Sequence, residues 1–174
     1  MAAVIDYLDD LEIGLCLRIN RACRKAAVRR VFSLVSRLGD AYLWVILSLA
    51  LIPLQGWLAL PQLGWIALNA AVGIGLYKVL KHHLVRERPY IHHGEIQLGT
   101  APLDRYSFPS GHTLHAVSFS IMLPHLEPMM ALITVPFAVM IALSRVVLGL
   151  HYPSDVLVGA LIGAALGTAA VGLM

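Results

Sequence analysis

From residue 41 onward, long apolar stretches alternate with short breaks that contain Gly, Pro or charged residues. A helix needs about 20 mainly apolar residues to cross a bilayer, with a range of about 17 to 25. Gly and Pro are typical of the turns between such helices. The pattern predicts five membrane-spanning helices, of which the third is short; they are placed at about residues 41–57, 62–80, 111–126, 128–148 and 154–173.

The segment 1–40 has a different pattern, in which apolar residues recur at helical spacing among charged ones. Neither of its two apolar stripes is long enough to span a bilayer, so we expect two amphipathic helices with a break near residues 20–24. Such helices either lie in the membrane interface, where the basic second one meets anionic headgroups, or pack on the outside of the bundle. The stripes consist of Leu8, Leu11, Leu15 and Ile19, and of Val28, Val31, Phe32, Val35 and Leu38.

The composition supports this division. The 174 residues are 59% hydrophobic and 13% charged, with a mean hydropathy of +0.77, and a soluble domain of this length needs far more polar surface. We therefore expect an all-α integral membrane protein, with an amphipathic interfacial arm at residues 1–40 and a transmembrane bundle at 41–174. The formal net charge is +3, but no nucleic-acid-binding motif accompanies it, so membrane lipids and not nucleic acid are the expected partners.

Two cations close the second predicted span. Lys81 and Arg88 are seven residues apart, which is nearly two helical turns, so we expect them on one helix face about 10 Å apart along the axis. Pro89 then ends the helix. The planar fork of Arg88 suits phosphate oxygens, and Lys81 adds a point charge. The alternative is that both side chains only extend to the membrane interface.

A second cluster, Pro109–His112, precedes the third span. Ser110 is a candidate N-cap, which places Gly111 and His112 in the first helical turn. The backbone N–H groups of that turn form an anion site, which glycine lets an anion approach closely. His112 is suited to protonating a leaving oxygen, or else it is an interfacial capping residue. His115 lies three residues further, but two histidines without matching carboxylates or cysteines make a poor metal site, so no metal is expected.

The third cluster contains Arg145, His151 and Asp155, at the turn between the fourth and fifth spans. A carboxylate four residues after a histidine can accept one ring N–H and leave the other nitrogen bare. This arrangement predicts an oriented nucleophile. The alternative for Asp155 is a helix N-terminal acid favoured by the dipole, which is compatible with the catalytic role.

The three clusters match, in order and spacing, the signature KxxxxxxRP, PSGH and SRxxxxxHxxxD, so the chain resembles the type 2 phosphatidic acid phosphatase (PAP2) family. The resemblance implies a metal-independent membrane lipid phosphatase without a cofactor. It also implies that His151 attacks phosphorus to form a phosphohistidine, that Asp155 orients His151, and that His112 protonates the leaving group. The residues implied to bind the phosphate are Lys81, Arg88, Ser110, Gly111 and Arg145.

The resemblance leaves the substrate open among polyprenyl diphosphate, phosphatidic acid and phosphatidylglycerophosphate. The alternatives are a lipid A phosphatase, a vanadate-dependent haloperoxidase or a non-enzymatic anion-conducting protein. The lack of a large soluble helical domain in the sequence argues against a haloperoxidase, and the histidine–aspartate set argues against simple anion transport. One difference from the usual family layout is that the amphipathic arm replaces the first of six spans. The segment between Pro89 and Pro109 is expected to act as a lid or to select the substrate.

Two arguments make different predictions about the side of the membrane on which the motif clusters lie. With five spans, all 13 Lys and Arg residues fall on the side that carries the arm and the motif clusters, which the positive-inside rule places in the cytoplasm. Similar family members carry their site on the periplasmic or outer face of the inner (plasma) membrane, and we take that face as the expectation.

Small and polar residues within the spans predict helix–helix contacts. Gly159, Gly163 and Gly167 form a stripe that lets another helix approach closely, either within the bundle or across a homodimer. Asn69, in the second span, is expected to donate a hydrogen bond to a neighbouring helix.

Overall fold

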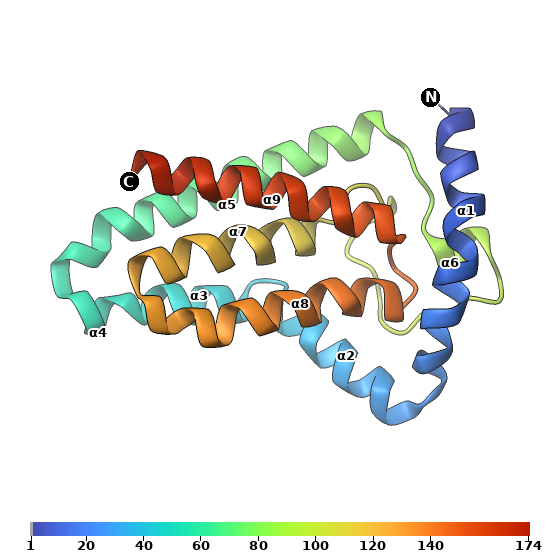
Figure 1. The fold of residues 1–174 in the computed structure, drawn as a ribbon, viewed down its shortest axis with the longest axis horizontal. Helices are drawn as coiled ribbons and strands as arrows, with labels where there is room; N and C mark the ends of the chain where they lie inside the picture. Colours follow the sequence, from blue (N-terminus) through green and yellow to red (C-terminus); the bar gives the residue numbers. More distant parts are fainter. Residues whose placement is uncertain (1) are drawn as a thin grey trace.

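The computed structural model describes residues 2–174, with side chains from residue 11 onward, and this part of the chain is helical without strands. Four long helices make up the body of the molecule (Figure 1). They are α5 (Ala59–His83), α7 (Gly111–Leu126), α8 (Ala131–Val147) and α9 (Pro153–Leu173). The others are α1 (Ala2–Asn20), η1 (Arg21–Arg24), α2 (Ala26–Leu38), α3 (Tyr42–Leu49), α4 (Leu51–Gln55), η2 (Gly56–Leu58), α6 (Pro89–His92) and η3 (Pro128–Met130).

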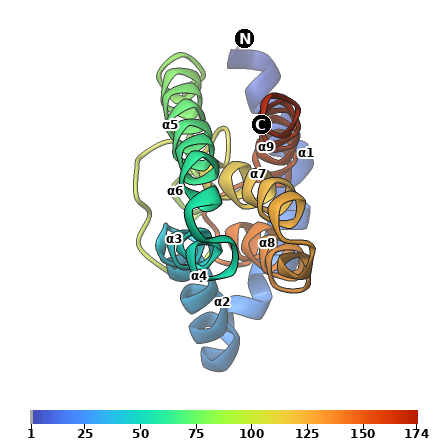
Figure 2. The same cartoon turned by 90° about the vertical axis from the view of Figure 1, so that its left-hand side faces the viewer.

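Helix α7 lies at the centre of the bundle. Seen end-on in Figure 2, it is surrounded by α5, α9, α8 and α3, and it packs on each of them. Its side chains are buried on several faces, among them Leu114, Met122 and Leu123, none of which has exposed surface. Such burial explains why the sequence of α7 is apolar around much of its circumference. It also places the N-terminus of α7, which carries the second motif cluster, among the ends of the neighbouring helices.

The glycine stripe of α9 faces α7. A Cβ atom added to Gly163 would lie 2.2 Å from the carbonyl oxygen of Leu114, and one added to Gly159 would lie 2.5 Å from that of Ser110. At Gly167 the corresponding distance to the Ser118 oxygen is 2.9 Å. The stripe is therefore used for close packing within the chain, the first of the two alternatives. The predicted hydrogen bond of Asn69 is confirmed, since its Nδ2 donates to Ser118 Oγ of α7 at 2.5 Å.

Three stretches in the described residues are long and apolar enough to cross a membrane: 42–83, 128–147 and 153–173. The first contains two of the predicted spans, because the chain reverses between α4 and α5 (Figure 1). Gly56 enables this turn with a φ of 62°. Helix α7 has 16 residues, which is below the usual length of a spanning helix. The all-helical membrane architecture is confirmed, whereas the count of five spans is not.

The N-terminal arm packs against the bundle. Helices α1 and α2 both contact α8, and the short η1 between them lies at the predicted break. Asn20 joins the arm to a loop and to the end of α8: its Nδ2 donates to the carbonyls of Gln97 and Val147 at 3.0 and 2.9 Å, and its Oδ1 accepts from the Gln97 backbone N–H at 2.8 Å. The arm therefore makes specific buried polar contacts in addition to its apolar packing.

Candidate active site

The three motif clusters meet at one end of the bundle, around a cavity of about 120 Å³. Helix ends and turns supply its walls, so charged side chains from distant parts of the sequence reach the same space. Six of the eight predicted site residues line the cavity: Lys81, Arg88, Gly111, His112, Arg145 and His151. The other two, Ser110 and Asp155, are fully buried in the surrounding structure.

His151 lies in the turn between α8 and α9 and is 1% exposed. Its Nδ1 lies 3.5 Å from Oδ2 of Asp155, at the outer limit of a hydrogen bond. Its Nε2 lies 3.3 Å from Nη1 of Arg88. Because a guanidinium can only donate, Nε2 is the acceptor and the ring proton is assigned to Nδ1, facing Asp155.

The surroundings of His151 favour its neutral form. Burial lowers the pKa of His151 well below its ordinary value, and the positive charges of Arg88 and Arg145 lower it further. Asp155 is held in place behind the ring, because its Oδ2 accepts from the backbone N–H of Tyr152 at 2.9 Å. The result is a buried, neutral imidazole with its lone pair directed toward cations, as the sequence pattern predicts for a nucleophile.

Lys81 and Arg88 reach the cavity by a route that the sequence analysis predicted wrongly. Helix α5 ends at His83, and Leu84 leaves the helical conformation with φ −109° and ψ 64°. Arg88 is extended, with φ −78° and ψ 149°, as expected for a residue that precedes proline. The backbone of this segment is held by Ser107, whose N–H donates to the Arg86 carbonyl at 2.9 Å. Lys81 therefore reaches the cavity from helix α5 and Arg88 from the extended segment that follows it, and the two do not share one helix face.

Asp104 bridges these two cations and was not predicted. Its Oδ1 and Oδ2 accept from Lys81 Nζ at 2.8 and 2.9 Å, and Oδ1 also accepts from Arg88 Nη2 at 2.7 Å. Burial opposes ionisation of this carboxyl, but the hydrogen bonds and charges of Lys81 and Arg88 outweigh it and lower its pKa. Asp104 thus accepts hydrogen bonds from Lys81 Nζ and Arg88 Nη2, two groups that are suited to binding an external anion. It is an acidic residue in a polar loop outside the signature, where no local pattern distinguishes it.

The second cluster adopts the predicted local structure. Ser110 is the N-cap of α7, and its Oγ accepts from the backbone N–H of Thr113 at 3.5 Å. The Ser110 N–H donates to the carbonyl of Asp155 at 3.0 Å, which ties this cluster to the third one. Gly111, the next residue in the chain, lines the cavity. His112 forms a hydrogen bond through Nε2 with the Asp40 carboxylate. The N-terminus of α7 therefore faces the cations across the cavity.

Arg145 is 2% exposed and projects from the last turn of α8. Its Nη1 donates to Ser36 Oγ of the arm at 2.5 Å. Within the described part of the chain, its buried Nε makes no hydrogen bond. A buried guanidinium with donor capacity left is unusual in a packed protein. This side chain is suited to binding an anion in the cavity.

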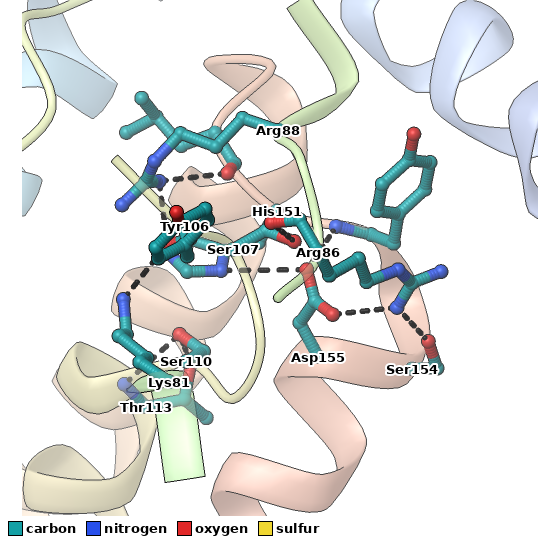
Figure 3. A network of polar contacts seen from close by, with 12 residues as sticks. Lys81, Arg86, Arg88, Tyr106, Ser107, Ser110, Thr113, His151, Ser154 and Asp155 are labelled. Carbon is teal, nitrogen blue, oxygen red and sulfur yellow. Dashed lines mark hydrogen bonds and ion pairs between the residues drawn. The ribbon is translucent and has the colours of Figure 1, made fainter. Parts of the chain in front are cut away.

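Arg86 contacts the third motif cluster and was not selected from the sequence. It is 2% exposed, and its Nη1 donates to Asp155 Oδ1 at 2.6 Å and to Ser154 Oγ at 2.7 Å (Figure 3). Its Nη2 donates to Oε2 of Glu12, from helix α1, at 2.9 Å. Glu12 also accepts from the backbone N–H and from the hydroxyl of Ser154, both at 2.7 Å. An arginine two residues before the signature Arg88 was the only signal available, and Glu12 had none.

Among the residues that the structure describes, no group of three or more His, Cys, Asp or Glu side chains is arranged to hold a metal ion. His115 packs between aromatic rings, with centroids 6.1 Å from Tyr77 and 6.0 Å from Phe119. What the cavity does combine is three cations, a helix N-terminus, a neutral histidine backed by a carboxylate, and a second histidine. This set can bind a multiply charged anion and attack it.

Comparison with solved structures shows the same fold in two other proteins. LpxE of Aquifex aeolicus superposes with a TM-score of 0.80 and 29% identity, covering 93% of this chain and 95% of that chain. A transmembrane PAP2 type phosphatidylglycerolphosphate phosphatase from Bacillus subtilis superposes with a TM-score of 0.67 and 26% identity, covering 92% of this chain and 84% of that chain.

Sequence comparison points to the same group. The decaprenylphosphoryl-5-phosphoribose phosphatase of Mycolicibacterium smegmatis is 37% identical over 118 residues, which cover 60% of this chain and 62% of that relative. The match thus spans less than two thirds of the relative's length. The sequence model of the PAP2 superfamily matches residues 62–174, more than half of the chain and all three motif clusters. The chain therefore belongs to the PAP2 superfamily.

Proposed function

We propose that the protein is a metal-independent membrane lipid phosphatase that works through a phosphohistidine at His151. The observation that carries this proposal is the state of His151. Its Nε2 faces Arg88 at 3.3 Å while its Nδ1 faces the buried carboxylate of Asp155. Both features prepare the ring to attack an anion held by the cations, and the named relatives in the family are phosphatases.

Substrate binding requires the cations to exchange partners. In this structure Lys81 and Arg88 bind the Asp104 carboxylate, and an arriving phosphate takes over these donors. Arg145 adds its unused Nε, and the N-terminus of α7 adds backbone N–H groups beside Gly111. Phosphoryl transfer depends mainly on positioning and on stabilising the charge of the equatorial oxygens. Three fixed cations and a helix N-terminus meet that requirement.

The reaction then proceeds in two steps. Nε2 of His151 attacks phosphorus while the bond to the leaving oxygen breaks, and His112 gives its proton to that oxygen. In the second step water attacks the phosphohistidine, His112 takes a proton from the water, and inorganic phosphate leaves. Asp155 holds the Nδ1–H throughout and stabilises the positive charge that the ring acquires.

A lipid substrate is supported by an apolar groove that begins at the cavity. The groove has a volume of about 360 Å³ and runs between α3 and α5, past Trp44 and Ile66. It shares Asp40, Ile74 and His115 with the catalytic cavity. A phosphate on an apolar chain fits this continuity. The substrates we propose to compare are polyprenyl phosphates and diphosphates, phosphatidic acid, phosphatidylglycerophosphate and lipid A.

The direct test is phosphate release by the purified protein in detergent from this panel, with and without chelator. We expect hydrolysis of at least one lipid phosphate that EDTA leaves unchanged and that vanadate inhibits, because vanadate occupies the same cationic site. The phosphoenzyme should be stable in alkali and labile in acid. Activity that EDTA removes and a divalent ion restores would contradict the metal-independent mechanism.

We further propose a multi-pass arrangement with five spans and an outward-facing site. Gly94 offers a labelling position, since it is exposed and a Cβ there meets nothing within 4 Å. Gly94→Cys, in a background with Cys16 and Cys23 replaced by Ala, should react with a membrane-impermeant maleimide in intact spheroplasts. Labelling only after lysis would place the site in the cytoplasm, as the charge distribution predicts.

A further inference from the structure

Asp40 is an acidic residue of the catalytic cavity that lies outside the three motif clusters. It is in the turn between α2 and α3, lines the cavity, and accepts a hydrogen bond at Oδ1 from Nε2 of His112. The side chain of Asp40 is 31% exposed and that of His112 is 11% exposed, so the contact lies at the edge of the buried site.

The turn that carries Asp40 is fixed on the bundle. One helical turn earlier, Ser36 is 3% exposed and accepts a hydrogen bond from Arg145 Nη1. Gly39 presses against α8, where an added Cβ would lie 2.7 Å from Cδ1 of Ile141. The backbone N–H of Asp40 donates to the Arg37 carbonyl at 3.2 Å. The end of α2 that leads into Asp40 is therefore fixed on the bundle, which holds the carboxylate in front of His112.

The charges around His112 give this contact a chemical role. The cavity contains Lys81, Arg88 and Arg145, and a protonated imidazole is unfavourable beside such cations. A general acid must nevertheless carry a proton when the leaving group departs. An ionised carboxylate in hydrogen-bond contact offsets the positive charges and fixes the orientation of the ring. Apart from Asp155, which serves His151, the described acids of the site are Asp40 and Asp104, and Asp104 is engaged by Lys81 and Arg88.

We propose that Asp40 is the positioning residue of the general acid His112. Its carboxylate holds Nε2–H of the protonated ring, so the proton on Nδ1 is the one that passes to the leaving oxygen as the P–O bond breaks. The ring becomes neutral, and Asp40 stays ionised. The protein then has two histidine–carboxylate pairs, His151 with Asp155 and His112 with Asp40. This inference rests on the proposed phosphatase function.

The test exploits the difference between leaving groups. An alkyl phosphate needs a proton on its leaving oxygen, whereas p-nitrophenyl phosphate does not, because p-nitrophenolate is stable. The parameter compared is kcat/KM, which covers only the steps up to leaving-group departure. We expect Asp40→Asn to lower kcat/KM for a short-chain phosphatidic acid by about 10- to 100-fold, and that for p-nitrophenyl phosphate by less than about threefold. His112→Ala should show the same selectivity with a larger loss.

The ratio of the two kcat/KM values does not depend on the fraction of folded protein, so it stays informative if Asp40→Asn is unstable. Asp40→Glu should recover part of the ratio, and Asp40→Asn should have no further effect in the His112→Ala background. Glu127→Gln, at the far end of α7, is the matched control and should change kcat/KM for neither substrate. Equal losses for both substrates would show that Asp40 only supports the fold. A wild-type protein that hydrolyses neither p-nitrophenyl phosphate nor any lipid phosphate of the panel would overturn the proposed function itself, and this inference with it.

Discussion

The signature helices and the N-terminal arm contribute to the same site in different ways. Helices α5, α7, α8 and α9 carry or adjoin all three motif clusters and supply the groups that face the cavity. The arm and the turn after it carry no signature residue, yet they supply polar side chains that hold those groups. Glu12 contacts Arg86 of the Arg86–Asp155 pair, Asn20 contacts the loop at Gln97 and the end of α8, Ser36 contacts Arg145, and Asp40 contacts His112. The groups proposed to carry out the chemistry lie in one region, and many of the side chains that hold them lie in the other.

The two regions are also held together by different forces. The bundle depends on close backbone approach, as between Gly163 of α9 and Leu114 of α7. Such packing is typical of helices in lipid, where burial of apolar surface between helices gives little gain. The arm is attached by buried, partly charged hydrogen bonds, each of which contributes about 0.5 to 3 kcal/mol. Substitutions in the bundle should therefore remove activity or folding, and substitutions in the arm should weaken both by smaller factors.

The largest effect is expected at His151. His151→Ala should remove turnover, by a factor of about 10³ or more, because the phosphoenzyme cannot form. Asp155→Asn should also reduce kcat strongly, since the ring loses its orientation. The measurement is lipid phosphate hydrolysis together with trapping of the phosphoenzyme. The control is His125→Ala, at an exposed histidine near the other end of α7. Wild-type rates in His151→Ala would refute the nucleophile assignment.

Arg88→Lys should have the next largest effect, lowering kcat/KM by about 10- to 100-fold. A lysine keeps the charge but cannot contact Asp104, Leu150 and His151 at the same time, as the guanidinium does at 2.7, 2.8 and 3.3 Å. Arg30→Lys, on the exposed face of α2, is the matched control and should leave kcat/KM unchanged. If both variants behave alike, the fork of Arg88 is not used in the transition state.

A third prediction tests how the bundle is held together. Gly163→Ala should lower the free energy of unfolding by about 1 to 3 kcal/mol, because the new Cβ would lie 2.2 Å from a backbone oxygen of α7. Gly75→Ala is the matched control, since a Cβ at this position of α5 meets nothing within 4 Å and alanine favours helix. Thermal unfolding in detergent, followed by circular dichroism, compares the two. Equal stability of the two variants would mean that α9 and α7 are not packed as closely as described.

The difference between the regions also explains what the sequence could predict. Residues such as His151, Asp155 and Ser110 lie at helix ends as expected, because their placement depends on fixed local spacing that a linear pattern preserves. The helical face expected for Lys81 and Arg88 was wrong, because the chain leaves the helix at Leu84 under tertiary contacts. Arg86, Asp104, Asp40 and Glu12 act through contacts with residues 16 to 74 positions away in the chain, which no local pattern records.

The smallest effect is expected from Glu12→Gln in the arm. In the wild type, Glu12 Oε1 accepts from the Ser154 N–H at 2.7 Å, and Oε2 pairs with Arg86 Nη2 at 2.9 Å. The amide of the variant can still accept from the Ser154 N–H, but it lacks the charge that pairs with Arg86. Arg86 then holds Asp155 less firmly, so we expect kcat to fall by about three- to tenfold with KM little changed, since Glu12 does not line the cavity. Glu127→Gln, at the far end of α7, is the matched control and should leave kcat unchanged.

Steady-state kinetics on the best lipid substrate measures the separate changes in kcat and KM, and the melting temperature is followed in parallel. A lower melting temperature with an unchanged kcat would show that the arm stabilises the fold without positioning the catalytic carboxylate, and the contrast between the two regions would then be one of stability alone.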